Sequence, residues 1–251
     1  MMIILDLDNT LLRSDKSISG YTISVLKACQ AKGIKVAFAT ARSTQAASGF
    51  LALFTPDIFI GYGGALVLAG EEVINRFDIP ADISSRLISE CLQEPAITSI
   101  LAVNETAAYA NRITPSVTMV SHYQRVDFSR IDNISYLKIS VVAANPGVVE
   151  RIASHYPMLD LLRYSGEDLY RFANRKALKW NAIQAISEYY HMGTDTFMAF
   201  GDDIIDLEMI KNCGVGVAVG NAVDEVKAAA NFICGTNDVD GVAKWLEEHV
   251  L

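Results

Sequence analysis

Cysteine is scarce in this sequence of 251 residues, and the pattern of its few cysteines excludes two classes of protein. The chain has four cysteines, and no two of them form a Cys-x-x-Cys pair. A disulfide framework and a structural zinc site both need closely spaced or regularly paired cysteines. We therefore expect reduced and mostly buried thiols.

Long apolar runs are also missing. No run approaches the roughly 20 apolar residues that a membrane-spanning helix needs. The first acidic residue, Asp6, comes too early for a signal peptide. We expect a cytoplasmic protein that has no membrane partner.

Positive charge is in deficit. The chain has 21 Lys and Arg residues against 29 Asp and Glu residues, a formal net charge of −8. An acidic surface repels nucleic acid, so no nucleic-acid partner is expected. An enzyme of this charge that acts on anionic substrates needs positive side chains inside its site. The four histidines lack the spacing of metal ligands, and no role is assigned to them.

Both ends of the chain alternate short apolar strands with amphipathic helices. In the first part, strands are predicted over residues 2–7, 34–39 and 57–61, with helices over 19–32 and 43–53. In the last part, strands are predicted over 196–200, 215–219 and 232–234, with helices over 179–190, 206–211, 223–230 and 241–249. Strands that alternate with helices indicate a parallel sheet joined by right-handed crossovers.

The middle of the chain follows a different pattern. Stretches such as 99–103, 136–142 and 168–172 alternate apolar and polar residues, which indicates half-exposed antiparallel strands. Helices are predicted over 83–94 and 147–156. We therefore predict an α/β protein with a discontinuous core of residues 1–80 and 175–251. An α+β domain of residues 81–174 is inserted between the two parts.

Two acidic residues follow the first predicted strand. Asp6 and Asp8 lie two residues apart, at the carboxyl end of a strand, where open α/β sheets place their ligands. Carboxylates this close repel each other unless a divalent cation lies nearby. One carboxylate then serves as nucleophile and the other as proton donor. A solvated acidic loop is the alternative.

A hydroxyl and a lysine follow at other predicted strand and helix ends. Thr40 comes directly after the second strand, where its hydroxyl and backbone N–H can hold a phosphate oxygen; an ordinary helix cap is the alternative. Lys179 begins a helix, a position that the helix dipole disfavours unless the lysine serves an anion or neighbouring carboxylates. Lys176 is the competing lysine, and either residue can simply be solvated.

A second acidic motif opens with Gly201. Asp202, Asp203 and Asp206 follow an apolar strand and start a helix. Because Asp202 and Asp206 are four residues apart, they can share one helix face. Their oxygens suit a hard cation such as Mg²⁺. An acidic helix cap is the alternative, but four such features at strand ends of one core favour a catalytic site.

These four motifs, Asp6-Leu7-Asp8-Asn9-Thr10-Leu11-Leu12, Thr40, Lys179 and Gly201-Asp202-Asp203-Ile204-Ile205-Asp206, resemble those of the haloacid dehalogenase-like hydrolase superfamily. Their order and spacing resemble its Cof-type branch, which includes many sugar-phosphate phosphatases. The resemblance spans essentially the whole chain. It implies a Rossmann-like parallel-sheet core with an inserted α+β C2-type cap domain.

The resemblance also implies roles for individual residues. Asp6 would attack phosphorus and form an aspartyl-phosphate, and Asp8 would protonate the leaving group and later deprotonate water. Thr40 and Lys179 would stabilise the phosphoryl group. Mg²⁺ would be held by Asp6, the backbone carbonyl of Asp8, and Asp202, with Asp206 as a further acid.

The expected activity is Mg²⁺-dependent hydrolysis of a small phosphorylated metabolite, most readily a sugar phosphate. A monomer is the default expectation, and an oligomer is the alternative. A phosphomutase of the same superfamily and a non-catalytic phosphate-binding homologue are the alternatives. Ile205 stands where the branch often has an asparagine, and Lys179 fits the lysine motif better than Lys176 does. Cap side chains would select the substrate; the candidates are Arg112, His122, Tyr123 and Arg125.

Overall fold

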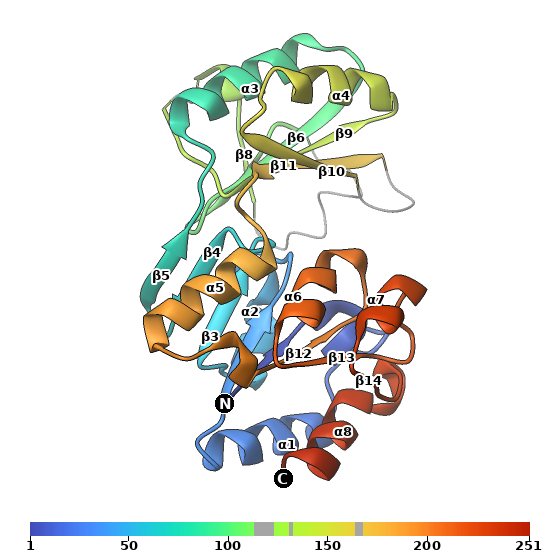
Figure 1. Cartoon of the computed structure of the whole chain (residues 1–251). Helices are drawn as coiled ribbons and strands as arrows, with labels where there is room; N and C mark the ends of the chain where they lie inside the picture. The colour runs from blue at the N-terminus through green and yellow to red at the C-terminus, as the bar shows by residue number, and fades with distance from the viewer. Residues whose placement is uncertain (113–122, 131–132, 164–167) are drawn as a thin grey trace. The chain divides into compact units, whose positions relative to one another are not determined.

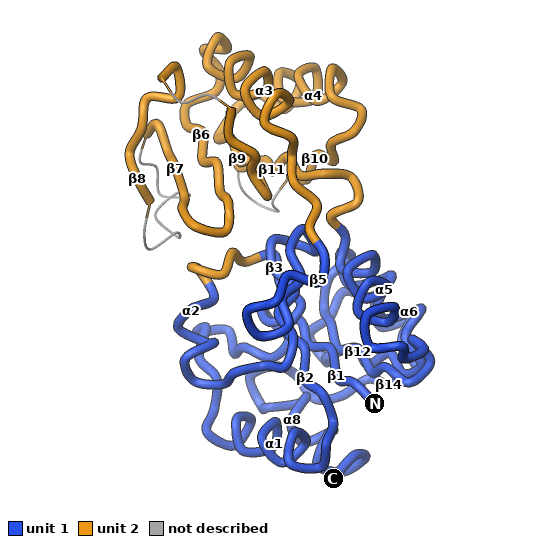
Figure 2. Tube along the Cα trace, turned by 90° about the vertical axis from the view of Figure 1, so that its left-hand side faces the viewer, with its two compact units in different colours: residues 1–41, 47–75, 178–251 blue, residues 42–46, 76–177 orange. Residues whose placement is uncertain are grey.

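The computed structural model describes residues 1–112, 123–130, 133–163 and 168–251, which form two compact units (Figure 2). Unit 1 comprises residues 1–41, 47–75 and 178–251. Unit 2 comprises residues 42–46 and 76–177. The division into two domains, one of residues 1–80 and 175–251 and the other of residues 81–174, stays a prediction. Of the candidate cap residues, His122 lies outside the described residues.

An eight-stranded sheet forms the centre of unit 1, with strands in the order β14-β13-β12-β1-β2-β3-β4-β5 (Figure 1). Its strands are β1 (Met2–Leu5), β2 (Lys35–Ala39), β3 (Ile58–Gly61), β4 (Leu66–Ala69), β5 (Glu72–Arg76), β12 (Phe197–Gly201), β13 (Val215–Ala218) and β14 (Phe232–Ile233). Neighbours from β14 to β3 pair in parallel, which confirms the predicted parallel core. The sequence patterns do not predict β4, which runs antiparallel to β3, or β5.

Helices lie on both sides of this sheet (Figures 1 and 2). They are α1 (Gly20–Ala31), α2 (Thr44–Leu53), α5 (Lys179–Tyr190), α6 (Leu207–Asn212), α7 (Asp224–Ala229) and α8 (Gly241–His249). Helix α1 packs against α8, and α6 packs against α5 and α7. Because helices cover both faces, the central strands are continuously apolar, and all four residues of β1 are fully buried.

The first strand ends earlier than predicted. It stops at Leu5, and a π-helical turn, η1 (Leu7–Leu11), follows Asp6. Within that turn Asn9 has a φ of 59°, in the left-handed region that asparagine tolerates better than most residues. The chain therefore bends sharply at the end of the strand, and Asp6 and Asp8 do not share one face of a longer strand.

A six-stranded sheet forms the centre of unit 2, in the order β10-β11-β9-β6-β7-β8. Its strands are β6 (Ile97–Val103), β7 (Ala108–Ala110), β8 (Gln124–Arg125), β9 (Lys138–Ala143), β10 (Leu159–Arg163) and β11 (Leu169–Asn174). The pairing from β10 through β7 is antiparallel, as predicted, whereas β7 and β8 are parallel. Helices α3 (Ala81–Gln93) and α4 (Pro146–Ser154) pack on one face (Figure 1).

The thiols match the sequence expectation. Cys29, Cys91 and Cys213 are buried, Cys234 is partly buried, and all four are free. Short helical turns complete the described chain: η2 (Phe128–Arg130), η3 (Thr194–Thr196), η4 (Ile204–Asp206) and η5 (Asn237–Val239). Over the described ranges, none of the helices has both the length and the apolar character that a membrane crossing requires.

Candidate active site

Three predicted site residues lie at one edge of the unit 1 sheet because three neighbouring parallel strands end there. Asp6 follows β1, Thr40 follows β2 and Asp202 follows β12. The register pairs Leu5 of β1 with Phe200 of β12 and with Phe38 of β2. Parallel strands that end in register bring the residues after them to a common edge, where α/β sheets bind their ligands.

Lys179 joins this edge from the first turn of α5. Its Nζ donates hydrogen bonds to Oδ1 of Asp6 at 2.5 Å and to Oδ1 of Asp206 at 2.6 Å. All three residues are at least 95% buried. A lysine at a helix N-terminus opposes the helix dipole. The two carboxylates offset that cost, so the unusual placement has the physical reason that the sequence predicts.

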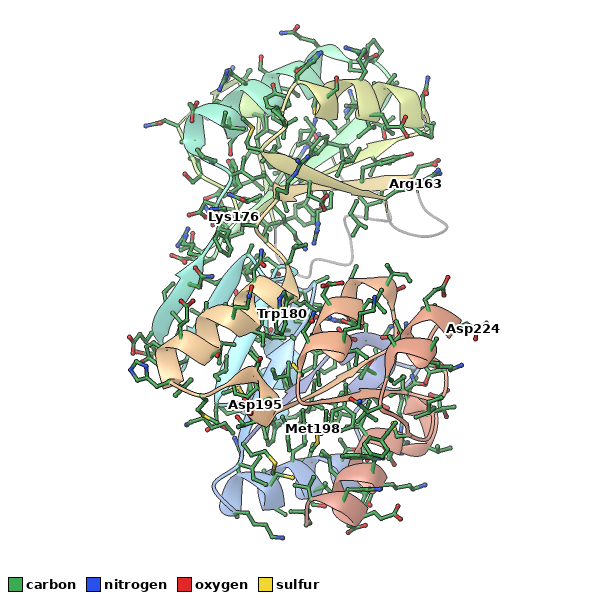
Figure 3. All side chains as sticks on the ribbon, in the orientation of Figure 1. Arg163, Lys176, Trp180, Asp195, Met198 and Asp224 are labelled. Atoms are coloured by element: carbon green, nitrogen blue, oxygen red, sulfur yellow. The ribbon has the colours of Figure 1, made fainter. Side chains whose placement is uncertain are left out.

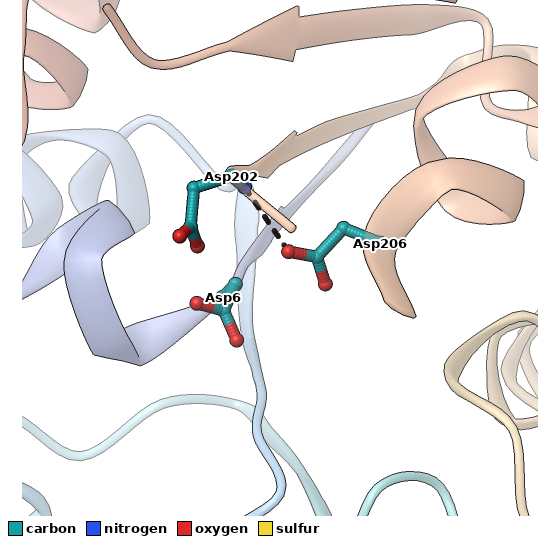
Figure 4. Close-up of side chains that lie close together, drawn as sticks. All are labelled: Asp6, Asp202 and Asp206. Atoms are coloured by element: carbon teal, nitrogen blue, oxygen red, sulfur yellow. Dashed lines mark hydrogen bonds between the residues drawn. The ribbon is translucent and has the colours of Figure 1, made fainter. Parts of the chain in front are cut away.

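Asp206 occupies the centre of a hydrogen-bond network. Its second oxygen, Oδ2, accepts a hydrogen bond from the backbone N–H of Asp202 at 3.1 Å (Figure 4) and another from the backbone N–H of Asp203 at 3.3 Å. Gly201 makes this approach possible, because a Cβ at that position would lie 2.8 Å from Cγ of Asp206. Asp206 therefore fixes both Lys179 and the backbone that carries Asp202.

Asp202 completes an acidic triad with Asp6 and Asp206. One carboxylate oxygen from each residue lies within 4.8 Å of the others. Oδ1 of Asp202 accepts a hydrogen bond from the Thr10 hydroxyl at 2.8 Å. Three ionised carboxylates and the ammonium of Lys179 carry a formal charge of −2, so a bound divalent cation would balance the cluster.

Burial sets the proton affinities of the cluster. It raises the pKa of Asp6 well above its usual value, and the charges of Asp206 and Asp202 add to this effect although Lys179 opposes it. Burial also raises the pKa of Asp202 to about 6, against the hydrogen bond from Thr10. Burial alone would lower the pKa of Lys179, but Asp206 and Asp6 outweigh it, so that pKa is raised. Lys179 is therefore charged at neutral pH.

Asp8 is placed apart from the triad. It lies in the π-helical turn, and its Oδ1 forms an ion pair with Nζ of Lys16 at 3.1 Å. Thr40 is buried at the end of β2, where its backbone N–H donates to the Ile60 carbonyl and its carbonyl accepts from Gly63. The structure thus gathers Asp6, Asp202, Asp206 and Lys179 tightly, and it holds Asp8 and Thr40 on the segments that leave two of the strands.

The structure also shows supporting residues to which the sequence patterns assign no role. Thr10 orients Asp202, and Lys16 pairs with Asp8. Gly64 has a φ of +108°, and a Cβ there would collide with the Leu178 carbonyl and lie 2.8 Å from the backbone nitrogen of Lys179. Only glycine fits such a conformation and approach. The two consecutive glycines at 63 and 64 were the available signal for this close contact.

Two residues that the sequence analysis singled out, Lys176 and Ile205, are exposed to solvent. Lys176 is exposed in the connection between β11 and α5, before the helix that carries Lys179 (Figure 3). Ile205 lies in η4 with 42% of its surface exposed. Neither side chain belongs to the acidic triad or its hydrogen bonds to Lys179.

A sequence model of haloacid dehalogenase-like hydrolases matches residues 3–246. The chain belongs to that family. The 5-amino-6-(5-phospho-D-ribitylamino)uracil phosphatase YitU of Bacillus subtilis is 28% identical to it, over 99% of this chain and 97% of that protein.

Two other relatives, one known by its sequence and one by its crystal structure, are similar over nearly the full length. The pyridoxal phosphate phosphatase YbhA of Escherichia coli is 27% identical, over 100% of this chain and 98% of that protein. The crystal structure of a haloacid dehalogenase-like hydrolase from Bacteroides thetaiotaomicron superposes with a TM-score of 0.88, at 25% identity and 98% coverage of both chains. The family and the mixed α/β fold expected from the sequence motifs are thereby confirmed.

Proposed function

We propose that this haloacid dehalogenase-like hydrolase is a Mg²⁺-dependent phosphatase of small phosphorylated metabolites, with sugar phosphates as the first substrates to test. The observation that carries the proposal is the buried lysine held between Asp6 and Asp206 beside Asp202. Relatives named as phosphatases over nearly the full length support it. Residues 1–80 and 175–251 form the proposed catalytic core, and residues 81–174 form the proposed cap.

The donor set fits the metal that the family implies. Carboxylate oxygens are the ligands that Mg²⁺ prefers, and the three carboxylates are close enough to surround one ion. Asp6, the Asp8 carbonyl and Asp202 would hold the ion. Asp206, whose two oxygens already bind Lys179 and two backbone amides, would support the site. When bound, Mg²⁺ neutralises phosphoryl charge and favours the in-line geometry of phosphoryl transfer.

Asp6 is the proposed nucleophile. Lys179 binds its Oδ1, so the hydrogen bond fixes the carboxylate and directs its other oxygen toward the phosphorus atom. As the new oxygen–phosphorus bond forms, the ester bond breaks and Asp8 gives its proton to the leaving oxygen. The products of this step are the free alcohol and an aspartyl-phosphate on Asp6.

Asp8 then reverses its role. Its carboxylate takes a proton from water, and the resulting hydroxide attacks the phosphorus atom and releases Asp6 and inorganic phosphate. Thr40 and Lys179 supply the donors that the transferring phosphoryl group needs. The ammonium of Lys179 provides buried positive charge beside the acidic residues of the site.

The test is phosphate release from p-nitrophenyl phosphate and a panel of sugar phosphates, measured with Mg²⁺ and with a chelator. The proposal expects multiple turnovers that need Mg²⁺ and stop with the chelator. Absence of turnover on every compound would contradict it and would favour a non-catalytic binding protein, with Ile205 as the first residue to replace with asparagine. Transfer of labelled phosphate to a second sugar in place of water would indicate a phosphomutase. A monomeric state and a cytoplasmic location stay predictions.

A further inference from the structure

The turn that follows β1 is held by two loops from elsewhere in unit 1. These loops follow β13 and β14, and β12 lies between β1 and β13 in the sheet. The chain after β1 therefore meets them across an intervening strand. Side-chain hydrogen bonds join the three segments, and two of these bonds link residues that are 212 and 225 positions apart in the sequence.

Asn221, in the loop after β13, contacts two of these segments. Its Nδ2 donates a hydrogen bond to the Asn9 carbonyl at 2.7 Å, and its Oδ1 accepts one from the backbone N–H of Asn237 at 3.0 Å. The two bonds use opposite ends of one amide group, so they fix its orientation. Asn221 therefore connects η1 with the loop after β14.

Asn237 holds the other end of η1. The residue is only 4% exposed, and its Nδ2 donates a hydrogen bond to the Leu12 carbonyl at 3.0 Å. Loss of one partner from a buried hydrogen bond costs roughly 1–3 kcal/mol, because the remaining group has no water in its place. The carbonyls of Asn9 and Leu12 thus both accept hydrogen bonds from asparagine side chains of distant loops.

The segment after η1 is bound to the same loop by an ion pair. Arg13 donates to Asp240 through Nε at 3.3 Å and through Nη2 at 2.7 Å. The carbonyl of Arg13 also accepts a hydrogen bond from the Lys16 backbone at 2.8 Å, and the Lys16 ammonium pairs with Asp8. The loop after β14 therefore also fixes the chain that presents Lys16 to Asp8.

Asp8 lies directly before the residue that Asn221 holds. Its backbone is extended, with φ −72° and ψ 125°, whereas Asn9 is left-handed with a φ of 59°. A left-handed conformation is uncommon for residues other than glycine, and contacts with the surrounding structure maintain it. The direction in which Asp8 leaves this bend therefore depends on the hydrogen bond that its neighbour accepts.

We infer that Asn221, supported by Asn237, is a positioning residue for Asp8. By holding the Asn9 carbonyl, it keeps the Asp8 carboxyl where its proton can pass to the leaving oxygen as the ester bond to phosphorus breaks. The inference rests on the proposed function, in which Asp8 is that proton donor.

A competing route runs through Thr10. The Asn9 carbonyl belongs to the peptide bond before Thr10, and the Thr10 hydroxyl binds Asp202. Through this route Asn221 would act on the cation site, and its loss would slow the transfer of phosphate from every ester alike. Action through Asp8 slows most the esters whose leaving oxygen needs a proton, so the choice of ester separates the two routes.

The test compares p-nitrophenyl phosphate, which has a good leaving group, with benzyl phosphate, whose leaving group is an alkyl alcohol that needs a proton. Alcohol release in single turnovers with Mg²⁺ reports the first step alone. Asn221→Ala should slow release from benzyl phosphate by about tenfold or more, and from p-nitrophenyl phosphate by less than about threefold. The matched control is Asn212→Ala, an exposed residue that donates to Glu208 of its own helix and should change neither rate.

A double-mutant cycle assigns the effect to Asp8. Asp8→Asn should itself slow benzyl phosphate more than p-nitrophenyl phosphate, because it removes the proton donor. Adding Asn221→Ala to that chain should change the ratio of the two rates by less than about twofold, since the group that Asn221 positions is absent. A further tenfold change in the ratio would show that Asn221 does not act through Asp8 and would overturn the inference.

Two other results would overturn the inference. One is an equal loss for both esters, or no loss for either, in Asn221→Ala. The other needs no turnover: the Leu12 amide donates to the Leu7 carbonyl within η1 at 2.8 Å, and its hydrogen exchange should be faster in Asn221→Ala. Unchanged exchange would show that Asn221 does not hold the turn. Absence of turnover in the unmodified chain would instead remove the proposed function, while the exchange rate still decides whether Asn221 holds η1.

Discussion

The two sheets of this protein carry their polar side chains in different places. In unit 1, the charged residues lie beyond the ends of parallel strands, where Asp6 and Asp202 meet Lys179 from the next helix. In unit 2, Lys138 and Arg171 lie within antiparallel strands, on the face opposite the helices. A sheet covered on both faces leaves only its strand ends for chemistry, whereas a sheet covered on one face can use a face.

The two clusters also differ in charge. The unit 1 cluster of three carboxylates and Lys179 is negative, whereas Lys138 and Arg171 on the unit 2 sheet are both positive. If the unit 1 cluster is the catalytic one, substitutions there should affect turnover most.

The largest effect is expected for Asp6→Asn. Loss of the nucleophilic carboxylate should lower kcat by at least about a thousandfold, because no neighbouring group replaces the bond to phosphorus. The measurement is steady-state phosphate release, with circular dichroism to check that the chain still folds. Turnover near that of the unmodified chain would remove Asp6 from its proposed role.

The next effect separates the two lysines. Lys179→Ala removes the buried cation that binds Asp6 and Asp206, and we expect kcat/KM to fall by about a hundredfold or more. Lys176→Ala, at an exposed position, serves as the matched control and should change kcat/KM by less than about threefold. Equal losses in the two variants, or a larger loss for Lys176→Ala, would contradict the assignment.

A glycine substitution tests whether the close approach of Gly64 to the backbone before α5 matters for stability. Gly64→Ala should lower the free energy of unfolding by about 3 kcal/mol, because the new Cβ collides with the backbone that leads into α5. Gly70→Ala is the control: its φ is +61° but no atom lies within 4 Å of the added Cβ, so about 1 kcal/mol is expected. Urea unfolding measures both values, and equal losses would show that the close approach is unimportant.

The smallest effect concerns pH. Since the pKa of Asp202 in the cation-free protein is raised to about 6, a proton occupies this carboxylate at lower pH and competes with the cation. Mg²⁺ affinity should therefore rise by up to about tenfold per pH unit below 6, where Asp202 holds its proton. Calorimetric titrations across this range provide the test, and an affinity independent of pH would show that Asp202 does not exchange its proton for the cation.

Much of unit 1 is predictable from the sequence because its signals are local. Each apolar run ends beside the residue that matters, so Asp6, Thr40 and Asp202 are marked by position alone. Lys179 is recognisable because a lysine at the start of a helix is unfavourable to the helix dipole unless it has anionic partners. The bend after Leu5 is less visible, because it depends on the left-handed conformation of Asn9.

Less of unit 2 is predictable from the sequence, because which of its side chains lie together depends on pairing between distant segments. Alternation predicts antiparallel strands, but it does not tell a solvated lysine from Lys138, which the neighbouring strand places beside Arg171. The sequence pattern likewise does not predict strand β10, which pairs with β11. The candidate cap residues Arg112 and Arg125 are exposed, while the buried Arg171 carries the unsatisfied donor. Burial, which the sequence pattern does not give, separates these cases.

The most direct test of the central claim is detection of the covalent intermediate on Asp6. The protein is mixed with a rapidly hydrolysed phosphate ester and Mg²⁺, quenched in acid during turnover, digested and examined by mass spectrometry. The account predicts phosphate on the peptide that contains Asp6, and none in the Asp6→Asn chain. Steady turnover with phosphate on no peptide, or on a residue other than Asp6, would contradict it.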